Sequence, residues 1–319
     1  RYNVERLLHI ARSQNDIDVL IRALTEITKS DPWGVSLSFA LLPSTNIRRT
    51  TYNDQFVTNL GVFTLAGEGE EESGLGISLG SALFYSLSVS DRSQLTLKAL
   101  ISHNIYDVSD LNQSNVRFAV SQEMFFVGGS AVIEPYVRFR FDELQNLERR
   151  DVGLSFSRSW WRENGAQFRA TINVENHNYI GSDSLSGPYG KINLRYSYSL
   201  DERTKFGFGV SLARSEPQEN HFRYLEGRVS ADISRNFSNL GNIGLFGSFT
   251  TREYDDFFPA TNLVRQDETV IFGASYSPRS FEIYGSRPRL SCQNEQNSSN
   301  IALYEYETTD CGITFERSF

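Results

Sequence analysis

The sequence predicts an all-β fold, an antiparallel transmembrane β-barrel of about 14 strands preceded by a short N-terminal αα-hairpin. From Pro32 onward, apolar and polar residues alternate with a period of two, in segments of roughly the ten residues that a tilted strand needs to cross a bilayer. The connections between these segments are alternately short and long, as in outer-membrane barrels. Aromatic residues make up 13% of the chain, which suits a barrel with an aromatic girdle at each interface.

Residues 3–29 form the only stretch with helical periodicity. Apolar residues recur at helical spacing on either side of a turn at residues 13–16. One such hairpin has the size of a helical-repeat unit and cannot bury its apolar face without neighbours. We therefore interpret residues 1–31 as the remnant of a periplasmic helical-repeat domain and residues 32–319 as an outer-membrane barrel. No apolar run approaches the roughly 18 residues of a transmembrane helix.

The predicted strands follow one another along the rest of the chain, each defined by alternating apolar residues. They cover residues 35–41, 75–85, 95–101, 116–124, 133–141, 152–156, 168–174, 192–198, 206–212, 225–233, 243–249, 270–276, 281–285 and 311–319. An even number of strands is typical of bacterial single-chain barrels. The alternative, a soluble solenoid or sandwich, gives no reason for turns that alternate in length.

The connections predict which side of the membrane each end of the barrel faces. Short turns rich in Gly, Asn, Asp and Ser lie near residues 90–92, 128–130, 163–165, 201–203, 239–242 and 278–280. Longer loops lie near residues 43–73, 107–114, 144–150, 180–188, 216–222, 253–267 and 293–300. Short turns are periplasmic in outer-membrane barrels, so we expect the N-terminal hairpin and the C-terminus in the periplasm. Whether the loop at 43–73 enters the lumen as a plug is left open.

Charged residues occupy positions that should face the lumen, because lumen-facing and lipid-facing residues alternate along each strand. The candidates are Arg117, Glu123, Glu134, Arg138, Arg140, Arg169, Glu175, Lys191, Arg195, Glu226, Arg228 and Asp232. Their mixed signs allow two interpretations. They line a hydrated conduit, or they form a network of ion pairs that closes the lumen, since a barrel of this size exists in both forms.

The sequence offers no catalytic, cofactor-binding or metal-binding motif. The four histidines lie in separate segments, and no Cys/His spacing resembles a zinc site. No motif brings together a Ser/His/acid set, so we predict that the protein is not an enzyme and has no cofactor. The net charge of −8 argues against nucleic acid as a partner.

Two features mark the end of the chain. Cys292 and Cys311 flank the last predicted hairpin almost symmetrically, so they should lie opposite each other and could form a disulfide in the oxidising periplasm. The alternative is two free, small apolar residues. Ile313, Phe315 and Phe319 share one face of the final segment, which resembles the signal that the barrel-assembly machinery reads.

Several short motifs resemble the surface lipoprotein assembly modifier family. They are DPW at residues 31–33, LPSTNI at 42–47, GSRPRL at 285–290, SNIALY at 299–304 and the closing segment to Phe319. The resemblance covers residues 32–319 and, weakly, the helical hairpin. The departure from the family pattern is that the helical-repeat domain is almost absent from this sequence.

The resemblance implies a protein exporter with a periplasmic tetratricopeptide-repeat domain and an outer-membrane barrel (type XI secretion). Its clients would be surface lipoproteins or secreted haem-binding proteins. Its other partners would be the barrel-assembly machinery and outer-membrane lipid, and it would act as a monomer. The alternatives are an exopolysaccharide export pore and a small-solute diffusion channel.

The size of the barrel limits how export could occur. A lumen enclosed by about 14 strands is too narrow for a folded client. The client would therefore cross the lumen unfolded, or leave through a lateral opening between the first and last strands, whose freed edges can pair with another strand. Residues 33–42 and 311–319 would form that opening.

Overall fold

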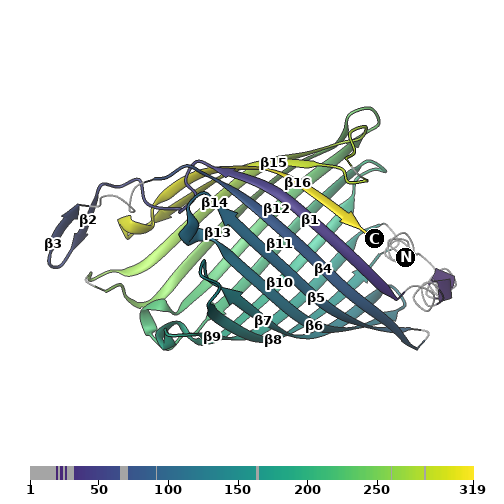
Figure 1. The fold of residues 1–319 in the computed structure, drawn as a ribbon, viewed down its shortest axis with the longest axis horizontal. Helices are drawn as coiled ribbons and strands as arrows, with labels where there is room; N and C mark the ends of the chain where they lie inside the picture. The colour runs from purple at the N-terminus through teal and green to yellow at the C-terminus, as the bar shows by residue number, and fades with distance from the viewer. Residues whose placement is uncertain are drawn as a thin grey trace.

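In the computed structural model the chain forms a closed antiparallel barrel of 14 strands (Figure 1). The structure describes residues 19, 20, 22, 23, 26, 32–64, 71–90, 92–162, 165–259, 261–283 and 285–319. The predicted helical hairpin at 3–29 thus lies almost entirely outside the described residues. No helix in the described part of the chain is long and apolar enough to cross a membrane.

The barrel strands follow in chain order, and each pairs with its neighbours in sequence. They are β1 (Trp33–Ser44), β4 (Gly74–Ser90), β5 (Ser93–Tyr106), β6 (Gln113–Phe126), β7 (Gly129–Phe141), β8 (Leu147–Trp161), β9 (Gln167–Tyr179), β10 (Gly187–Ser199), β11 (Thr204–Ser215), β12 (Tyr224–Phe237), β13 (Gly241–Phe257), β14 (Val264–Pro278), β15 (Arg289–Ser299) and β16 (Tyr306–Ser318). β1 pairs with β16 and closes the barrel. The predicted all-β fold, antiparallel closure and strand number are confirmed.

One predicted strand is wrong. Residues 281–285 belong to the connection between β14 and β15, where Ile283 and Ser286 form only an isolated bridge. The thirteenth barrel strand is β15, much of which the sequence analysis placed in a loop at 293–300. Phe281 and Ile283 imitate the alternation of a strand, whereas β15 carries polar residues on both faces and gives no such signal.

The two ends of the barrel differ in their loops. One end carries short connections except for 279–288, and the start of β1 and the C-terminus lie there (Figure 1). The other end carries four 3₁₀ turns: η2 (Ser109–Leu111), η3 (Asp183–Leu185), η4 (Asn220–Phe222) and η5 (Ala302–Tyr304). The loop after β1 also lies there. It contains a hairpin, β2 (Gln55–Thr58) and β3 (Gly61–Thr64), which projects away from the barrel (Figure 1).

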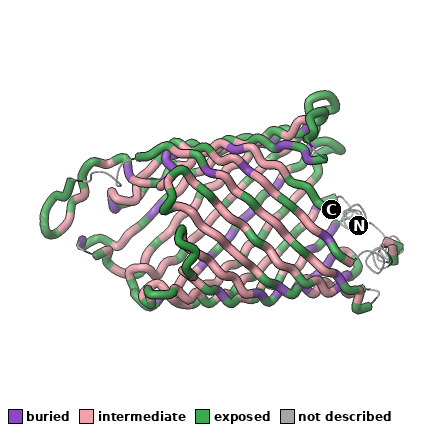
Figure 2. The backbone as a smooth tube through the Cα atoms, viewed as in Figure 1, coloured by how far each residue is buried: buried purple, intermediate pink, exposed green. Residues whose placement is uncertain are grey.

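The barrel has no conventional hydrophobic core. Buried residues are scattered over the wall, as Figure 2 shows. Large apolar side chains such as Leu79, Phe118, Leu154 and Phe272 are exposed on the outer face. Closure gives every barrel strand two paired neighbours and leaves no open sheet edge, which allows this outer face to contact lipid. The inner face therefore holds the polar residues that define the candidate site.

Candidate functional site: the lumen wall and the barrel seam

Three neighbouring strands are joined by ion pairs centred on Arg138 of β7. Its Nε donates to Asp151 Oδ2 of β8 at 2.7 Å, and its Nη2 donates to Glu175 Oε2 of β9 at 2.7 Å. Arg149 lies 2.9 Å from Asp151, and His177 Nε2 lies 3.2 Å from Glu175. The Asp151 side chain is only 1% exposed, so its charge depends on these partners.

This cluster also contains a possible set of metal ligands. One ligand atom from each of Asp151, Glu175 and His177 lies within 4.8 Å of the others. The sequence analysis predicted no metal site. Arg138 and Arg149 already compensate the two carboxylates, so the geometry is that of an ion-pair network rather than a cation site.

A second cluster surrounds Glu134 of β7. Lys98 Nζ of β5 and Arg117 Nη2 of β6 donate to its two carboxylate oxygens at 2.7 and 2.6 Å. The next residue is Pro135, where the β6–β7 pairing is interrupted between Ala119↔Tyr136 and Gln122↔Ile133. A proline has no N–H to donate to the ladder. The ion pairs therefore bridge the two strands where their backbone hydrogen bonding is interrupted.

A third group of pairs lies further around the wall, on β10 to β13. Arg195 of β10 donates to Asp232 of β12 at 2.6 Å across the intervening β11. Gly207 of β11 makes this possible, because a Cβ there would overlap both side chains. Arg252 of β13 donates to Glu226 of β12 at 2.6 Å.

The remaining predicted lumen residues lie outside these three groups of ion pairs. Arg169 donates to Ser159 and Arg228 to Ser248, at 3.1 and 2.8 Å. Arg140 lies 3.9 Å from Glu148. Glu123 lines a cavity of about 530 Å³, and Lys191 lies opposite Asn173 and Ala213 in the sheet.

Four partners of these residues were not among the predicted lumen residues: Lys98, Arg149, Asp151 and Arg252. The alternation contained the signal for Lys98, which lies between Leu97 and Ala99. Arg149 and Asp151 were missed because the predicted strand began at Val152, whereas β8 begins at Leu147.

The wall formed by β1 and β4 is different. Its inner positions are uncharged and mostly small, including Ser36, Ser38 and Ala40 on β1 and Gly80 and Ala82 on β4. Within the described residues, no ion pair involves a side chain of β1 or β4. A cavity of about 580 Å³ separates this wall from Arg117 and Arg138.

The seam between β1 and β16 has an interrupted ladder. Val35 and Phe319 exchange both backbone hydrogen bonds, at 3.2 and 2.8 Å. Pairing continues to Leu41↔Ile313, is missing at the next two positions, and resumes at Ser44↔Asp310 in the same register. Pro43 lies in the gap, opposite Cys311, and cannot donate. This is the position at which the alternation of hydrogen-bonded pairs requires an N–H.

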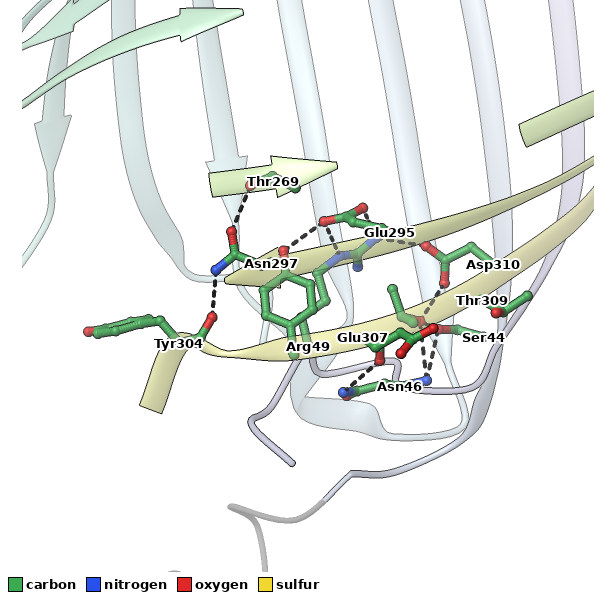
Figure 3. A network of polar contacts seen from close by, with 12 residues as sticks. Ser44, Asn46, Arg49, Thr269, Glu295, Asn297, Tyr304, Glu307, Thr309 and Asp310 are labelled. Carbon is green, nitrogen blue, oxygen red and sulfur yellow. Dashed lines mark hydrogen bonds and ion pairs between the residues drawn. The ribbon is translucent and has the colours of Figure 1, made fainter. Parts of the chain in front are cut away.

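Above the gap, the loop that follows β1 binds β15 and β16 (Figure 3). Arg49 Nη2 donates to Asp310 Oδ2 at 2.8 Å, and Arg49 Nε to Glu295 Oε1 at 3.4 Å. The Asn46 side chain donates to the backbone carbonyl of Glu307 at 3.4 Å. Ser44 and Thr308 share a hydrogen bond of 3.0 Å between their hydroxyls. We call these contacts the loop clamp.

The same loop reaches the neighbouring loop between β5 and β6. Arg48 donates to both carboxylate oxygens of Asp110 at 2.6 and 3.0 Å, and to Glu72 at 2.9 Å. The hydrogen bond from Arg48 lowers the pKa of the Asp110 carboxyl below its ordinary value, and the two carboxylates raise the pKa of Arg48.

The two cysteines and the terminal aromatic residues lie beside the seam. Cys292 and Cys311 are directly opposite on β15 and β16 and form a disulfide. Ile313 pairs with Leu41, and the ring of Phe315 lies 6.3 Å from that of Phe39. Phe319 is exposed, and the Arg317 guanidinium stacks over its ring at 4.5 Å.

A closed barrel with an apolar exterior and a polar interior defines an outer-membrane β-barrel protein. The chain belongs to the surface lipoprotein assembly modifier family, whose model matches residues 33–319. That is the family suspected from the motifs. None of the curated proteins matches the sequence.

Solved outer-membrane barrels are similar to the chain only in general form. OprD of Pseudomonas aeruginosa has 9% identity and a TM-score of 0.47, with 91% of this chain and 94% of that chain covered. An outer-membrane channel from Pseudomonas putida F1 has 11% identity and a TM-score of 0.46, with 90% and 96% covered. At this level of similarity we draw no functional argument from them.

Proposed function

We propose that this barrel is a translocator that moves client proteins, surface lipoproteins in the first place, to the bacterial cell surface. The family's description, surface lipoprotein assembly modifier, supports this class of client. The observation that carries the mechanism is the interrupted seam at Pro43, together with the uncharged, mostly small inner residues of β1.

The proposed mechanism is a lateral opening of that seam. Separating β1 from β16 breaks ladder hydrogen bonds and the loop clamp around Arg49. The three ion-paired clusters on β5 to β13 stay intact. The freed edges then offer unpaired N–H and C=O groups to an extended client segment. Residues 1–31, as part of a periplasmic repeat domain, would present the client, and the aromatic final strand would direct assembly of the barrel itself.

A covalent lock on the seam tests this proposal. Ser38 and Glu316 are opposed across β1 and β16, three residues from the hydrogen-bonded pair Val35–Phe319 and hence a closely spaced, non-hydrogen-bonded pair. Ser38→Cys with Glu316→Cys, in a background carrying Cys292→Ala and Cys311→Ala, should abolish surface exposure of a co-expressed lipoprotein under oxidising conditions. Reduction should restore it.

The matched control locks a pair away from the seam. Asn193 of β10 and Ser211 of β11 face each other in the same way, so Asn193→Cys with Ser211→Cys should leave export intact. Protease shaving of intact cells gives the readout. Full export through the locked seam would exclude lateral opening and favour passage through the lumen. A steady single-channel conductance with no movement of any lipoprotein would instead favour a small-solute channel.

A further inference from the structure

Near its loop end, the outer face of the hairpin β15–β16 is polar, although the neighbouring outer residues of β14 are apolar. Asn294 and Gln296 of β15 pair with Phe272 and Val270 of β14, which are 61% and 44% exposed on the outer face. On β16, Thr309 pairs with Asn294 and Glu307 with Gln296. These four residues therefore share the outer face, and we call them the polar strip.

The polar strip satisfies only part of its hydrogen-bonding capacity. Asn294 Nδ2 donates to Glu307 Oε1 at 2.9 Å and to Thr309 Oγ1 at 3.3 Å. Gln296 is exposed and makes no side-chain hydrogen bond within the described residues. Polar groups that face hydrocarbon without partners are costly, and intramembrane polar residues usually mark a contact or a pathway.

The polar strip lies directly beside the seam. The Thr309 N–H donates to Thr45 Oγ1 at 2.8 Å, and Cys311, two residues further along, lies opposite Pro43 in the ladder gap. The Cys292–Cys311 disulfide joins the two strands that carry the strip. If β16 separates from β1, the hairpin β15–β16 would move as one covalently joined unit with the polar strip along its outer face.

The charges of the polar strip indicate which kind of ligand could bind there. It contains one carboxylate, Glu307, and no Lys or Arg, and its outward neighbour Glu268, opposite Ser298, is also acidic. Phosphate-bearing lipid headgroups are bound by clusters of Lys and Arg, so an anionic headgroup is a poor match. Amides and hydroxyls at alternate positions of adjacent strands suit the N–H and C=O groups of an extended polypeptide.

We propose that the polar strip is a docking surface for an extended, neutral or basic segment of the client polypeptide, contacted as the client leaves through the seam. This inference rests on the proposed function, because it takes the exported protein as the occupant. It specifies that the client contacts β15 and β16 rather than β1, and that amide and hydroxyl side chains make this contact.

Site-specific crosslinking tests the docking surface. A photo-crosslinking amino acid is placed at Gln296 or at Thr309, and at Val210 on the outer face of β11 as the matched control. The probe is an epitope-tagged surface lipoprotein co-expressed with the barrel, and its surface exposure is scored in the same cells. Crosslinks to the lipoprotein from residues 296 and 309, and none from residue 210, are expected.

The outcomes separate this inference from the proposed function. Normal export with crosslinks only to lipopolysaccharide, or only to a second copy of the barrel, would overturn the docking surface and leave the export proposal standing. Absence of both export and crosslinks would overturn both.

An apolar replacement gives a second measurement that does not depend on crosslinking. Asn294→Leu with Thr309→Val removes two hydrogen-bonding groups, so export should fall about tenfold. The barrel should still fold, as judged by its heat-modifiable migration, and Val210→Leu should change neither property. Unchanged export together with a more stable barrel would show that the strip only faces lipid.

Discussion

Two prolines interrupt the ladder of this barrel, and the surroundings of the two interruptions differ. At Pro135 the gap between β6 and β7 is bridged by Glu134 with Lys98 and Arg117, on the inner face. At Pro43 the gap between β1 and β16 has only uncharged residues on the inner face. It is held from the loop side by the clamp around Arg49. The same backbone defect is thus bridged by ion pairs on the inner face of one wall and only by loop contacts in the other, which is why we propose that the barrel opens at the seam.

The largest expected effect comes from removing the reinforcement at Pro135. Glu134→Ala leaves Lys98 and Arg117 without their shared carboxylate, whose side chain is 12% exposed. Breaking a largely buried ion pair should lower the free energy of unfolding by about 3 kcal/mol. Urea unfolding in lipid vesicles measures it. Asp232→Ala, which breaks a pair that is 39–42% exposed, should cost clearly less, and equal losses would contradict the comparison.

Removing the disulfide should have the next largest effect. Cys292→Ala with Cys311→Ala opens a link between residues 19 positions apart, in a hairpin that backbone pairing already holds. We expect a loss of about 2 kcal/mol, at the low end of the usual range because the hairpin remains paired. The same urea experiment, run on the parent with and without reductant, checks the value. A loss that appears in the double variant but not on reduction would point to packing rather than to the crosslink.

A substitution at Pro43 can restore the missing backbone donor at the seam. Pro43→Ala supplies an N–H opposite Cys311, worth about 1 kcal/mol if the ladder closes. A tighter seam should reduce export about fivefold. Pro135→Ala is the matched control, since it adds a donor in the reinforced wall and should not alter export. Equal effects of the two variants on export would contradict the proposal that the barrel opens at the seam.

The smallest expected effect is a pH dependence of the loop that follows β1. Arg48 lowers the pKa of Asp110 below 3.8, its ordinary value. The contact therefore stabilises the loop fully above that pH, and the stabilisation is lost as the pH falls through the lowered pKa. Limited proteolysis of residues 43–73 should accelerate in that acid range. In Arg48→Gln, cleavage should be faster at neutral pH and less dependent on pH.

The sequence predicted the closed barrel because period-two alternation and loop length are local signals. It failed at β15 for a physical reason. A strand is recognised by an apolar face, and the outer face of β15 carries Asn294 and Gln296 instead. The strand that escaped prediction is thus one of the two that carry the proposed docking surface. Phe281 and Ile283, which were taken for it, belong to a connection.

The candidate site was less predictable than the fold. Alternation indicates which residues face inward, but partners such as Arg138 and Glu175 belong to strands separated by β8. A pair that skips a strand can also require a small residue in the strand between, as Gly207 shows for Arg195 and Asp232. The gap at Pro43 is visible only once β1 and β16 are known to pair, which no local pattern can show.

The closing contact also bears on how the barrel forms. Ser36 and Ser318, which share a hydrogen bond across the seam, are 282 positions apart in the chain. All other neighbouring pairs in the barrel join strands consecutive around the wall and in sequence. Pairing across so long a separation carries a large entropic cost and is slow compared with hairpin formation. We therefore expect the open sheet to assemble first, so that the seam is the last part of the barrel to form and the first available for exchange with another strand.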